Sequence, residues 1–337
     1  MKSTLRTRHS RAVLVVAITA AMATSIVGCS SQGGAATSSD AVKGATVSIV
    51  GPEAGDPYYQ EVACGARTEG KKLGMTVGEQ QAAQNQSQAS QNTIVQNVLT
   101  KSPKALIYTP ADPVAGGLPL RNAKQDGVTV IDVDAQLSDA GLYDSFIASD
   151  HYQGAQKITK TLVELIGGSG EIAAIGSLPS NPITQARIKG FQDELKNYPN
   201  VKVVNVSYPD LSPDAIQADA ASLLIKYPEL KGIYTTNFLN STGAAVALRN
   251  ANLVGKVKMV SWDTGAPNVK LLEEGSVQAT VAQQPFTMGQ LAIQQIAKKL
   301  AGGKPVKTVH APVSILTSEQ VDTPTGKKLW YSGTCSG

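Results

Sequence analysis

From residue 45 onward, short runs rich in β-branched and apolar residues alternate with longer segments of helical periodicity. Several runs are apolar throughout, which is typical of strands covered on both faces of a parallel sheet. Between them, 155–166 spaces its apolar residues three or four apart, and Ser212-Pro213-Asp214 is typical of a helix start. Eleven runs are predicted to be strands: 46–51, 75–79, 105–109, 128–133, 145–149, 171–176, 201–208, 232–236, 257–262, 278–282 and 312–316.

Repeated strand–helix–strand order predicts parallel sheets with helices on both faces. Eleven strands fit two sheets better than one, and they fit an eight-stranded barrel less well. We therefore predict an α/β protein with two doubly wound parallel-sheet domains joined by a three-segment hinge. The first domain is predicted at 45–148 plus 284–312, and the second domain with its tail at 149–283 plus 313–337. The three crossings are expected near 148–150, 283–285 and 312–314.

The N-terminal 28 residues contain basic side chains followed by an apolar run over 12–27, a pattern typical of a signal peptide. The run ends Ile26-Val27-Gly28-Cys29, which resembles a bacterial lipobox and predicts lipidation of Cys29. A plain secretory signal with an incidental Cys29 remains the alternative. Residues 29–44 are rich in Ser, Gly and Ala and predict a flexible tether. We therefore expect an extracytoplasmic protein that a lipid anchors to the cell membrane.

Charge and composition disfavour several other classes of protein. The chain has 30 Lys+Arg and 26 Asp+Glu, but four of the basic residues lie in the first 28, which hold no acid. The remaining chain has 26 charges of each sign, and a neutral surface disfavours nucleic-acid binding. The three Cys and three His show no metal-ligand spacing, and no phosphate-binding glycine motif occurs. We expect no metal and no cofactor.

Polar and aromatic side chains gather where the predicted strands end. The segments concerned are 55–59, 132–136, 236–238, 261–264 and 282–286. In open α/β sheets, ligands bind outside the carboxyl ends of the strands. Carboxylates accept hydrogen bonds from hydroxyl groups, carboxamides donate and accept them, and aromatic faces cover C–H surfaces. This combination favours a sugar or polyol as the ligand.

Short motifs in order along the chain resemble the ribose-type periplasmic sugar-binding proteins. The opening Thr46-Val47-Ser48-Ile49-Val50 is followed by Asp56-Pro57-Tyr58-Tyr59, where the family has Asn-Pro-Phe-Phe, and then by Lys72-Leu73-Gly74. The resemblance continues to about residue 316 through Ile147-Ala148-Ser149-Asp150, Arg187, Gly190-Phe191, Thr236-Asn237, Trp262-Asp263 and Ala279-Thr280-Val281-Ala282-Gln283. It implies the type I periplasmic binding protein fold and a monomer that is not an enzyme. Such a protein captures a monosaccharide or polyol between its domains and delivers it to an ABC transporter permease.

The resemblance implies ligand contacts in the first domain. Asp56 matches the Asn of the family motif and is expected to bond a hydroxyl group. Tyr58 and Tyr59 match the two aromatics that form the pocket wall, and Asp134 matches an acceptor of sugar hydroxyls. Each residue also has a structural alternative: the aspartates could shape turns, and the tyrosines could belong to the core.

In the second domain and the hinge, the resemblance implies that Asn237, Asp263 and Gln283 are polar ligand contacts. Asn237 and Asp263 could instead be turn or surface residues, and Gln283 could be a satisfied buried amide. Two family arginines that face the ligand are replaced here, one by Ala135 and the other by Gln185. Gln185 is retained as a ligand-binding candidate, and the two replacements favour a ligand other than ribose.

Cys64 and Cys335 remain once Cys29 is assigned to lipid. In an exported protein, an even pair of cysteines suggests a disulfide. A bridge would hold the tail after residue 320, which extends beyond what the family fold needs. Two separate thiols are the alternative.

Two other functions stay open at this stage. One is a sensory binding module that delivers a sugar-like signal to a receptor. The other is a glycoside hydrolase, with Asp134 and Asp263 as the two carboxylates, although neither lies in a recognisable acid/base motif.

Overall fold

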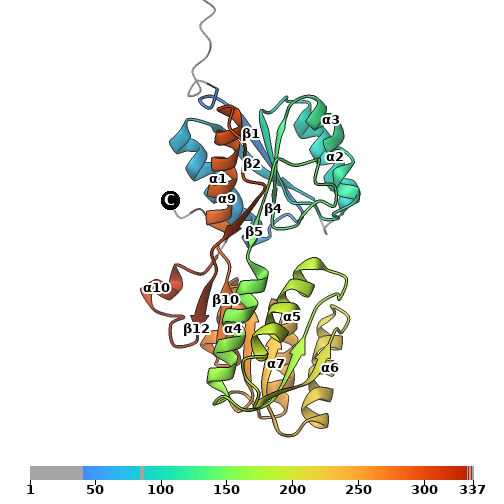
Figure 1. Cartoon of the computed structure of the whole chain (residues 1–337), viewed down its shortest axis with the longest axis vertical. Coiled ribbons are helices and arrows are strands. Elements are labelled where there is room, and N and C mark those ends of the chain that lie inside the picture. The colour runs from blue at the N-terminus through green and yellow to red at the C-terminus, as the bar shows by residue number, and fades with distance from the viewer. Residues whose placement is uncertain (1–40, 84–86, 332, 334, 336–337) are drawn as a thin grey trace, which may run out of the picture. The chain divides into compact units, whose positions relative to one another are not determined.

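The computed structural model describes residues 41–83, 87–331, 333 and 335. The predicted signal peptide and Cys29 lie outside these residues. The described chain forms two six-stranded sheets with helices on their faces (Figure 1). The predicted α/β fold with two doubly wound sheets is therefore confirmed.

We call the first sheet and its helices the first lobe. Its strand order is β11-β5-β4-β3-β1-β2, and all the pairings are parallel. Its strands are β1 (Thr46–Gly51), β2 (Thr76–Ala82), β3 (Ala105–Tyr108), β4 (Thr129–Val133), β5 (Ser145–Ser149) and β11 (Thr308–Ala311). Its helices are α1 (Pro57–Leu73), α2 (Gln88–Leu99), η1 (Ala115–Gly117), α3 (Leu120–Gln125) and α9 (Pro285–Leu300).

Strand β3 shows why its sequence is apolar throughout. Ala105 and Ile107 pack into the core on one face of the sheet, whereas Leu106 and Tyr108 pack into the core on the other. Helices α1 and α9 cover the first face, and α2 and α3 cover the second (Figure 1). Because side chains alternate across a strand, both faces of β3 must be apolar to bury it in this way.

Two glycines allow α1 and α9 to lie in close contact. A Cβ added at Gly65 of α1 would collide with the carbonyl of Phe286, and one added at Gly289 of α9 would collide with the carbonyl of Val62. The obstacles are backbone atoms of the facing helix, which no rotamer change can move. The helix at the start of the first lobe is thus packed against one that follows it by more than two hundred residues.

We call the second sheet and its helices the second lobe. Its strand order is β12-β10-β9-β8-β6-β7, in which only β12 is antiparallel to its neighbour among the pairings described. Its strands are β6 (Gly170–Ile175), β7 (Val201–Ser207), β8 (Leu230–Thr235), β9 (Lys258–Trp262), β10 (Ala279–Ala282) and β12 (Ser314–Thr317). Its helices are α4 (His151–Leu165), α5 (Pro182–Leu195), α6 (Pro213–Lys226), α7 (Phe238–Asn250), α8 (Ala266–Glu273) and α10 (Pro324–Lys327).

The predicted helix start at Ser212 is present in α6. The Ser212 side chain accepts a hydrogen bond from the Ala215 N–H, Pro213 is in the first turn, and Asp214 is the acid there. Eleven described strands overlap the predicted runs, and the sequence reading omitted β11. His310 lies in this strand. Most of β11 is solvent-accessible, so its sequence lacks the apolar run that reveals a buried strand.

Three connections pass from one sheet to the other. They lie between β5 and α4, between β10 and α9, and between β11 and β12. At the first, Asp150 caps α4 by accepting from the Gln153 N–H. At the third, only two residues separate the strands, so the edge strand of one sheet leads directly into the edge strand of the other.

The end of the chain differs from the predicted domain limits. Residues 313–337 were all expected with the second lobe, and Leu329 and Trp330 do pack against its core. Tyr331, however, packs into the core of the first lobe, and Cys335 is disulfide-bonded to Cys64 in α1. The tail therefore forms a fourth link between the two lobes. No helix in the described part of the chain is long and apolar enough to cross a membrane.

Candidate binding site

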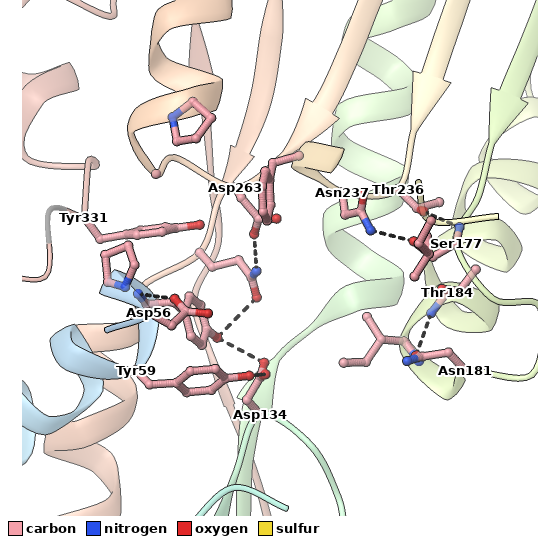
Figure 2. Close-up of a pocket in the computed structure, with 18 of the residues that line it drawn as sticks. Asp56, Tyr59, Asp134, Ser177, Asn181, Thr184, Thr236, Asn237, Asp263 and Tyr331 are labelled. Carbon is pink, nitrogen blue, oxygen red and sulfur yellow. Dashed lines mark hydrogen bonds between the residues drawn. The ribbon is translucent and has the colours of Figure 1, made fainter. Parts of the chain in front are cut away.

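A cavity of about 740 Å³ is lined by residues of both lobes, the hinge and the tail. Figure 2 shows its polar side chains directed toward a shared space. The predicted site residues that line it are Asp56, Tyr58, Tyr59, Asp134, Asn237, Asp263 and Gln283. The structure thus brings together seven of the eight residues expected to contact the ligand.

The start of α1 supplies the first-lobe wall. Asp56 is the N-cap and accepts a hydrogen bond from the Tyr58 N–H at 2.9 Å, with Pro57 in the first helical turn. The rings of Tyr58 and Tyr59 meet edge to face, with centroids 5.1 Å apart. The Asp-Pro-Tyr-Tyr motif therefore both begins the helix and places a carboxylate beside two aromatic rings.

Asp134 follows β4 and binds both tyrosines. The Tyr58 hydroxyl lies 3.1 Å from Asp134 Oδ1, and the Tyr59 hydroxyl lies 3.0 Å from Asp134 Oδ2. Each carboxylate oxygen has a second lone pair, so it can accept from a ligand hydroxyl as well. The two phenols hold the carboxylate in one orientation at the cavity.

Polar contacts through Tyr58 and Gln283 connect Asp134 to Asp263 across the hinge (Figure 2). Gln283 donates through Nε2 to Asp263 Oδ1 at 2.6 Å, and its Oε1 lies 3.5 Å from the Tyr58 hydroxyl. Tyr58 has one proton for three acceptors within reach: Asp134, Gln283 and the sulfur of Met288. A ligand that hydrogen-bonds to Asp134 or Gln283 would therefore change which of these acceptors receives the Tyr58 proton.

The second-lobe wall combines an amide with hydroxyl groups. Asn237 caps α7 by accepting from the Asn240 N–H at 2.9 Å, and its Nδ2 donates to Ser177 Oγ at 2.5 Å. Thr236 Oγ1 accepts from the Ser177 N–H at 3.1 Å. Ser177 and Thr236 line the cavity, although the sequence reading did not select them. Their positions just after strands of the second sheet could have identified them as cavity residues from the sequence.

Arg187 is buried at the cavity, although the sequence analysis did not select it as a ligand contact. Its guanidinium stacks 3.7 Å over the Trp262 ring and donates to the Thr236 carbonyl at 2.6 Å. It also lies 3.3 Å from Nδ1 of His151. These contacts fix the arginine, and its positive charge acts to lower the pKa of Asp134, which lines the same cavity.

The structure does not bring Gln185 to the cavity. Gln185 is on the exposed face of α5, where its amide donates to the Pro179 carbonyl at 3.0 Å. The helix begins after the N-cap Asn181, and this start turns Thr184 and Arg187 inward, three residues apart. The direction of each side chain around the helix therefore places Thr184 at the cavity, where the sequence predicted Gln185.

Tyr331 is the lining residue that lies farthest from any sequence motif. Its ring packs edge to face on Tyr58, with centroids 5.6 Å apart, and it is 7% exposed. Figure 2 shows its phenol directed toward Asp263. The sequence around Tyr331 contains no pattern that would predict a binding-site residue. Its position depends on contacts with residues far away in the sequence.

Burial changes the protonation behaviour of the cavity. Burial raises the pKa of Asp134, although hydrogen bonds from Tyr59 and Tyr58 act in the opposite direction. Burial also raises the pKa of Asp56, against the hydrogen bond from the Tyr58 backbone. The pKa values of Tyr58 and Tyr59 are raised well above 10, mainly by burial, so both phenols remain protonated donors. In the described residues, no cluster of three His, Cys, Asp or Glu could hold a metal ion.

A family model described as the periplasmic binding protein domain matches residues 47–305. This chain belongs to the periplasmic binding protein family. The match covers every cavity residue except Tyr331 and most of both lobes, and β11, β12 and α10 lie beyond it. This periplasmic binding protein thus carries its tail outside the part that the family model describes.

Curated relatives and solved structures agree with this assignment. The chain is 26% identical over 287 residues to the D-apiose import binding protein of Actinobacillus succinogenes, covering 84% of this chain and 90% of that protein. It is 25% identical to the D-allose-binding periplasmic protein of Escherichia coli, covering 82% and 91%. The structure of a sugar-binding protein of a sugar ABC transporter from Bacillus halodurans is 26% identical, with a TM-score of 0.77 and coverage of 82% and 98%.

Proposed function

We propose that this periplasmic binding protein captures a monosaccharide or polyol in the cavity between its lobes and delivers it to the permease of an ABC importer. The protein performs no chemical step on the ligand. A lipid on Cys29 holds it at the outer face of the cell membrane, with the chain that follows as the tether. The predicted tether 29–44 is too long at its end, because Val42 packs against the first lobe and the Gly44 N–H donates to the Gly74 carbonyl.

The observation that carries the proposal is the acceptor-rich cavity. Asp56 and Asp134 come from the first lobe and Asp263 from the second, and aromatic rings lie beside them. Carboxylates bind hydroxyl groups strongly, and aromatic faces cover the apolar side of a sugar ring. A ligand that bonds to carboxylates on both lobes stabilises the arrangement in which both reach it.

The relatives support the same class of ligand. Their names specify D-apiose, D-allose and ribose, and one solved relative from Agrobacterium radiobacter contains D-arabinose, with 26% identity and a TM-score of 0.71. All of these are small polyhydroxylated molecules that carry no charge. The D-apiose and ribose relatives are named as import binding proteins, which supports delivery to a permease.

Titration calorimetry of the mature oxidised protein tests ligand capture directly. The panel holds aldopentoses, aldohexoses, ketohexoses, pentitols and hexitols, including the four sugars that the relatives name. We expect saturable one-site binding by at least one member. Glycosides of the same sugars are incubated with the protein and followed by mass spectrometry; we expect them unchanged, and hydrolysis of a glycoside would contradict the absence of chemistry. Failure of every panel member to bind would reject the sugar-binding proposal.

A further inference from the structure

We propose that Tyr331, which the disulfide-closed tail carries into the cavity, contacts the bound ligand and contributes to its selectivity. The inference rests on the proposed function, because it concerns the same cavity. Tyr331 adds to that cavity a wall that lies outside the Asp-Pro-Tyr-Tyr motif and outside the sheets and helices of the two lobes.

The path of the tail is fixed at several points. Leu329 and Trp330 pack against the core of the second lobe, and Thr264 Oγ1 donates to the Leu329 carbonyl at 2.5 Å. The Tyr331 N–H donates to the Thr264 carbonyl at 3.4 Å. Because Thr264 directly follows Asp263, these bonds place Tyr331 next to a carboxylate that lines the cavity.

Beyond Tyr331, the tail is anchored on the first lobe. Cys335 is bonded to Cys64 of α1, with Cα atoms 5.3 Å apart, and the Arg67 guanidinium lies 2.9 Å from the sulfur of Cys335. Gly333 has a φ of 74° and lies so close to Pro57 that a Cβ there would come within 2.9 Å of the Pro57 Cα. This position therefore requires glycine, both for its left-handed backbone and for its close approach to the start of α1.

The Tyr331 ring is placed for ligand contact and not only for packing. It lines the cavity beside Tyr58, and its phenol is directed toward Asp263 (Figure 2). Burial, followed by the charge of Asp263, raises the pKa of the phenol well above 10, so it stays a donor. The phenol lies near Asp263 and Asp56, and its proton can be donated either to Asp263 or to an acceptor oxygen on the ligand, while the ring edge limits the ligand's size on this side.

The bridge matters because it closes the tail onto α1 beyond Tyr331. Reduction breaks one S–S bond and forms two thiols, with dithiothreitol oxidised to its cyclic disulfide. The tail can then leave α1, and ordering Tyr331 again costs conformational entropy when the ligand binds. Ligand affinity should therefore depend on the oxidation state of two cysteines that lie outside the cavity.

The test uses the full mature chain and the panel member that the wild type binds best. Peptide mapping first establishes the Cys64–Cys335 bridge in protein purified under non-reducing conditions. We expect Tyr331→Ala to weaken binding by about 10- to 100-fold and Tyr331→Phe by about 3- to 10-fold, which corresponds to loss of an aromatic wall or of one hydrogen bond. Tyr227→Phe, which removes a phenol from the second lobe away from the cavity, should bind like the wild type.

Two further measurements separate contact from general stability. Tyr331→Ala should also change the ratio of affinities between panel members, which loss of packing alone would not do. Cys335→Ser should weaken binding to the same extent as dithiothreitol treatment of the wild type, and dithiothreitol should not weaken it further. Because Cys335 is exposed, this variant is expected to fold.

The outcomes distinguish this inference from the proposed function. If the wild type binds a panel member and both Tyr331 variants match it in affinity and selectivity, the ligand contact is wrong although sugar capture stands. Two free thiols in the purified protein, or full affinity after reduction, would overturn the role of the bridge. If the wild type binds no member of the panel, sugar capture and the Tyr331 contact are both rejected.

Discussion

Asp134 and Asp263 occupy equivalent positions in the two lobes. Each is the first residue after a strand, β4 or β9, and each has a left-handed backbone, with φ values of 67° and 81°. The N–H of each donates to the neighbouring strand, to the Ile147 carbonyl at 2.8 Å and the Val281 carbonyl at 2.9 Å. A left-handed backbone costs a non-glycine residue about 1–2 kcal/mol. Both carboxylates line one cavity, and both keep a backbone conformation that costs free energy. This combination supports a role in ligand binding.

Replacing either aspartate with alanine should weaken ligand binding by roughly 10- to 150-fold. Each replacement leaves ligand hydroxyls buried without an acceptor, and bonds to a charged group contribute about 1.5–3 kcal/mol. Calorimetry of Asp134→Ala and Asp263→Ala, with circular dichroism to confirm folding, measures the effect. Asp139→Ala is the control, since Asp139 is exposed and does not line the cavity. Wild-type affinity in both cavity variants would show that the ligand binds elsewhere.

The raised pKa of Asp134 predicts a pH-dependent stability in the ligand-free protein. Because the pKa of Asp134 in the folded protein lies above its ordinary value of 3.8, the carboxyl's contribution to stability is complete below pH 3.8 and is lost as pH rises through the folded pKa. At neutral pH, Asp134→Asn should therefore unfold at a higher temperature than the wild type. The difference should shrink on acidification between the raised pKa and 3.8. A melting-temperature difference that does not change with pH would contradict this.

Ligand binding should show the opposite response to acid. Ligand hydroxyls donate to the ionised carboxylates of Asp56 and Asp134, so protons compete with the ligand as pH falls. We expect the dissociation constant to rise on acidification, starting at a higher pH than for an ordinary aspartate. Calorimetry at several pH values measures this, and Asp134→Asn should reduce the slope. An affinity that stays constant down to pH 4 would mean that neither carboxylate accepts from the ligand.

Cys29→Ala should release the protein from the membrane fraction. Stable anchoring needs more than one acyl chain, and a bacterial lipobox cysteine would carry them. Immunoblots of membrane and soluble fractions from the native host measure the distribution. Ser30→Ala, at the next position, should leave the protein in the membrane fraction. Equal sedimentation of wild type and Cys29→Ala would remove Cys29 as the anchor.

Substitution of Gly289 tests the contact between α1 and α9. Gly289→Ala places a methyl group against the backbone of Val62, and such overpacking should lower the free energy of unfolding by about 1–3 kcal/mol. Gly78→Ala is the matched control, because its added Cβ would have only an ordinary contact, 3.7 Å from the Val47 carbonyl. Chemical denaturation compares the two, and equal stability would show that α9 can move away at no cost.

Local patterns predicted most of the fold because buried parallel strands need apolar side chains on both faces. Strand β11 was omitted because its exposure removes this requirement. In the site, residues directly after strands could be placed from sequence, since the carboxyl ends of parallel strands share one edge. The position of Gln185 could not be predicted in this way, because the direction of its side chain depends on where α5 begins. Tyr331 could not either, because a bridge spanning 271 residues determines its location.

The packing of α1 on α9 also bears on the order in which the two lobes can fold. Helix α1 lies near the start of the described chain, but α9 and β11, which complete the first lobe, come after nearly all of the second. The strands β6 to β10 form a continuous stretch of chain, so the second lobe can assemble its core while the first is still incomplete. When the chain leaves the membrane N-terminus first, the apolar face of α1 therefore stays exposed until α9 has followed.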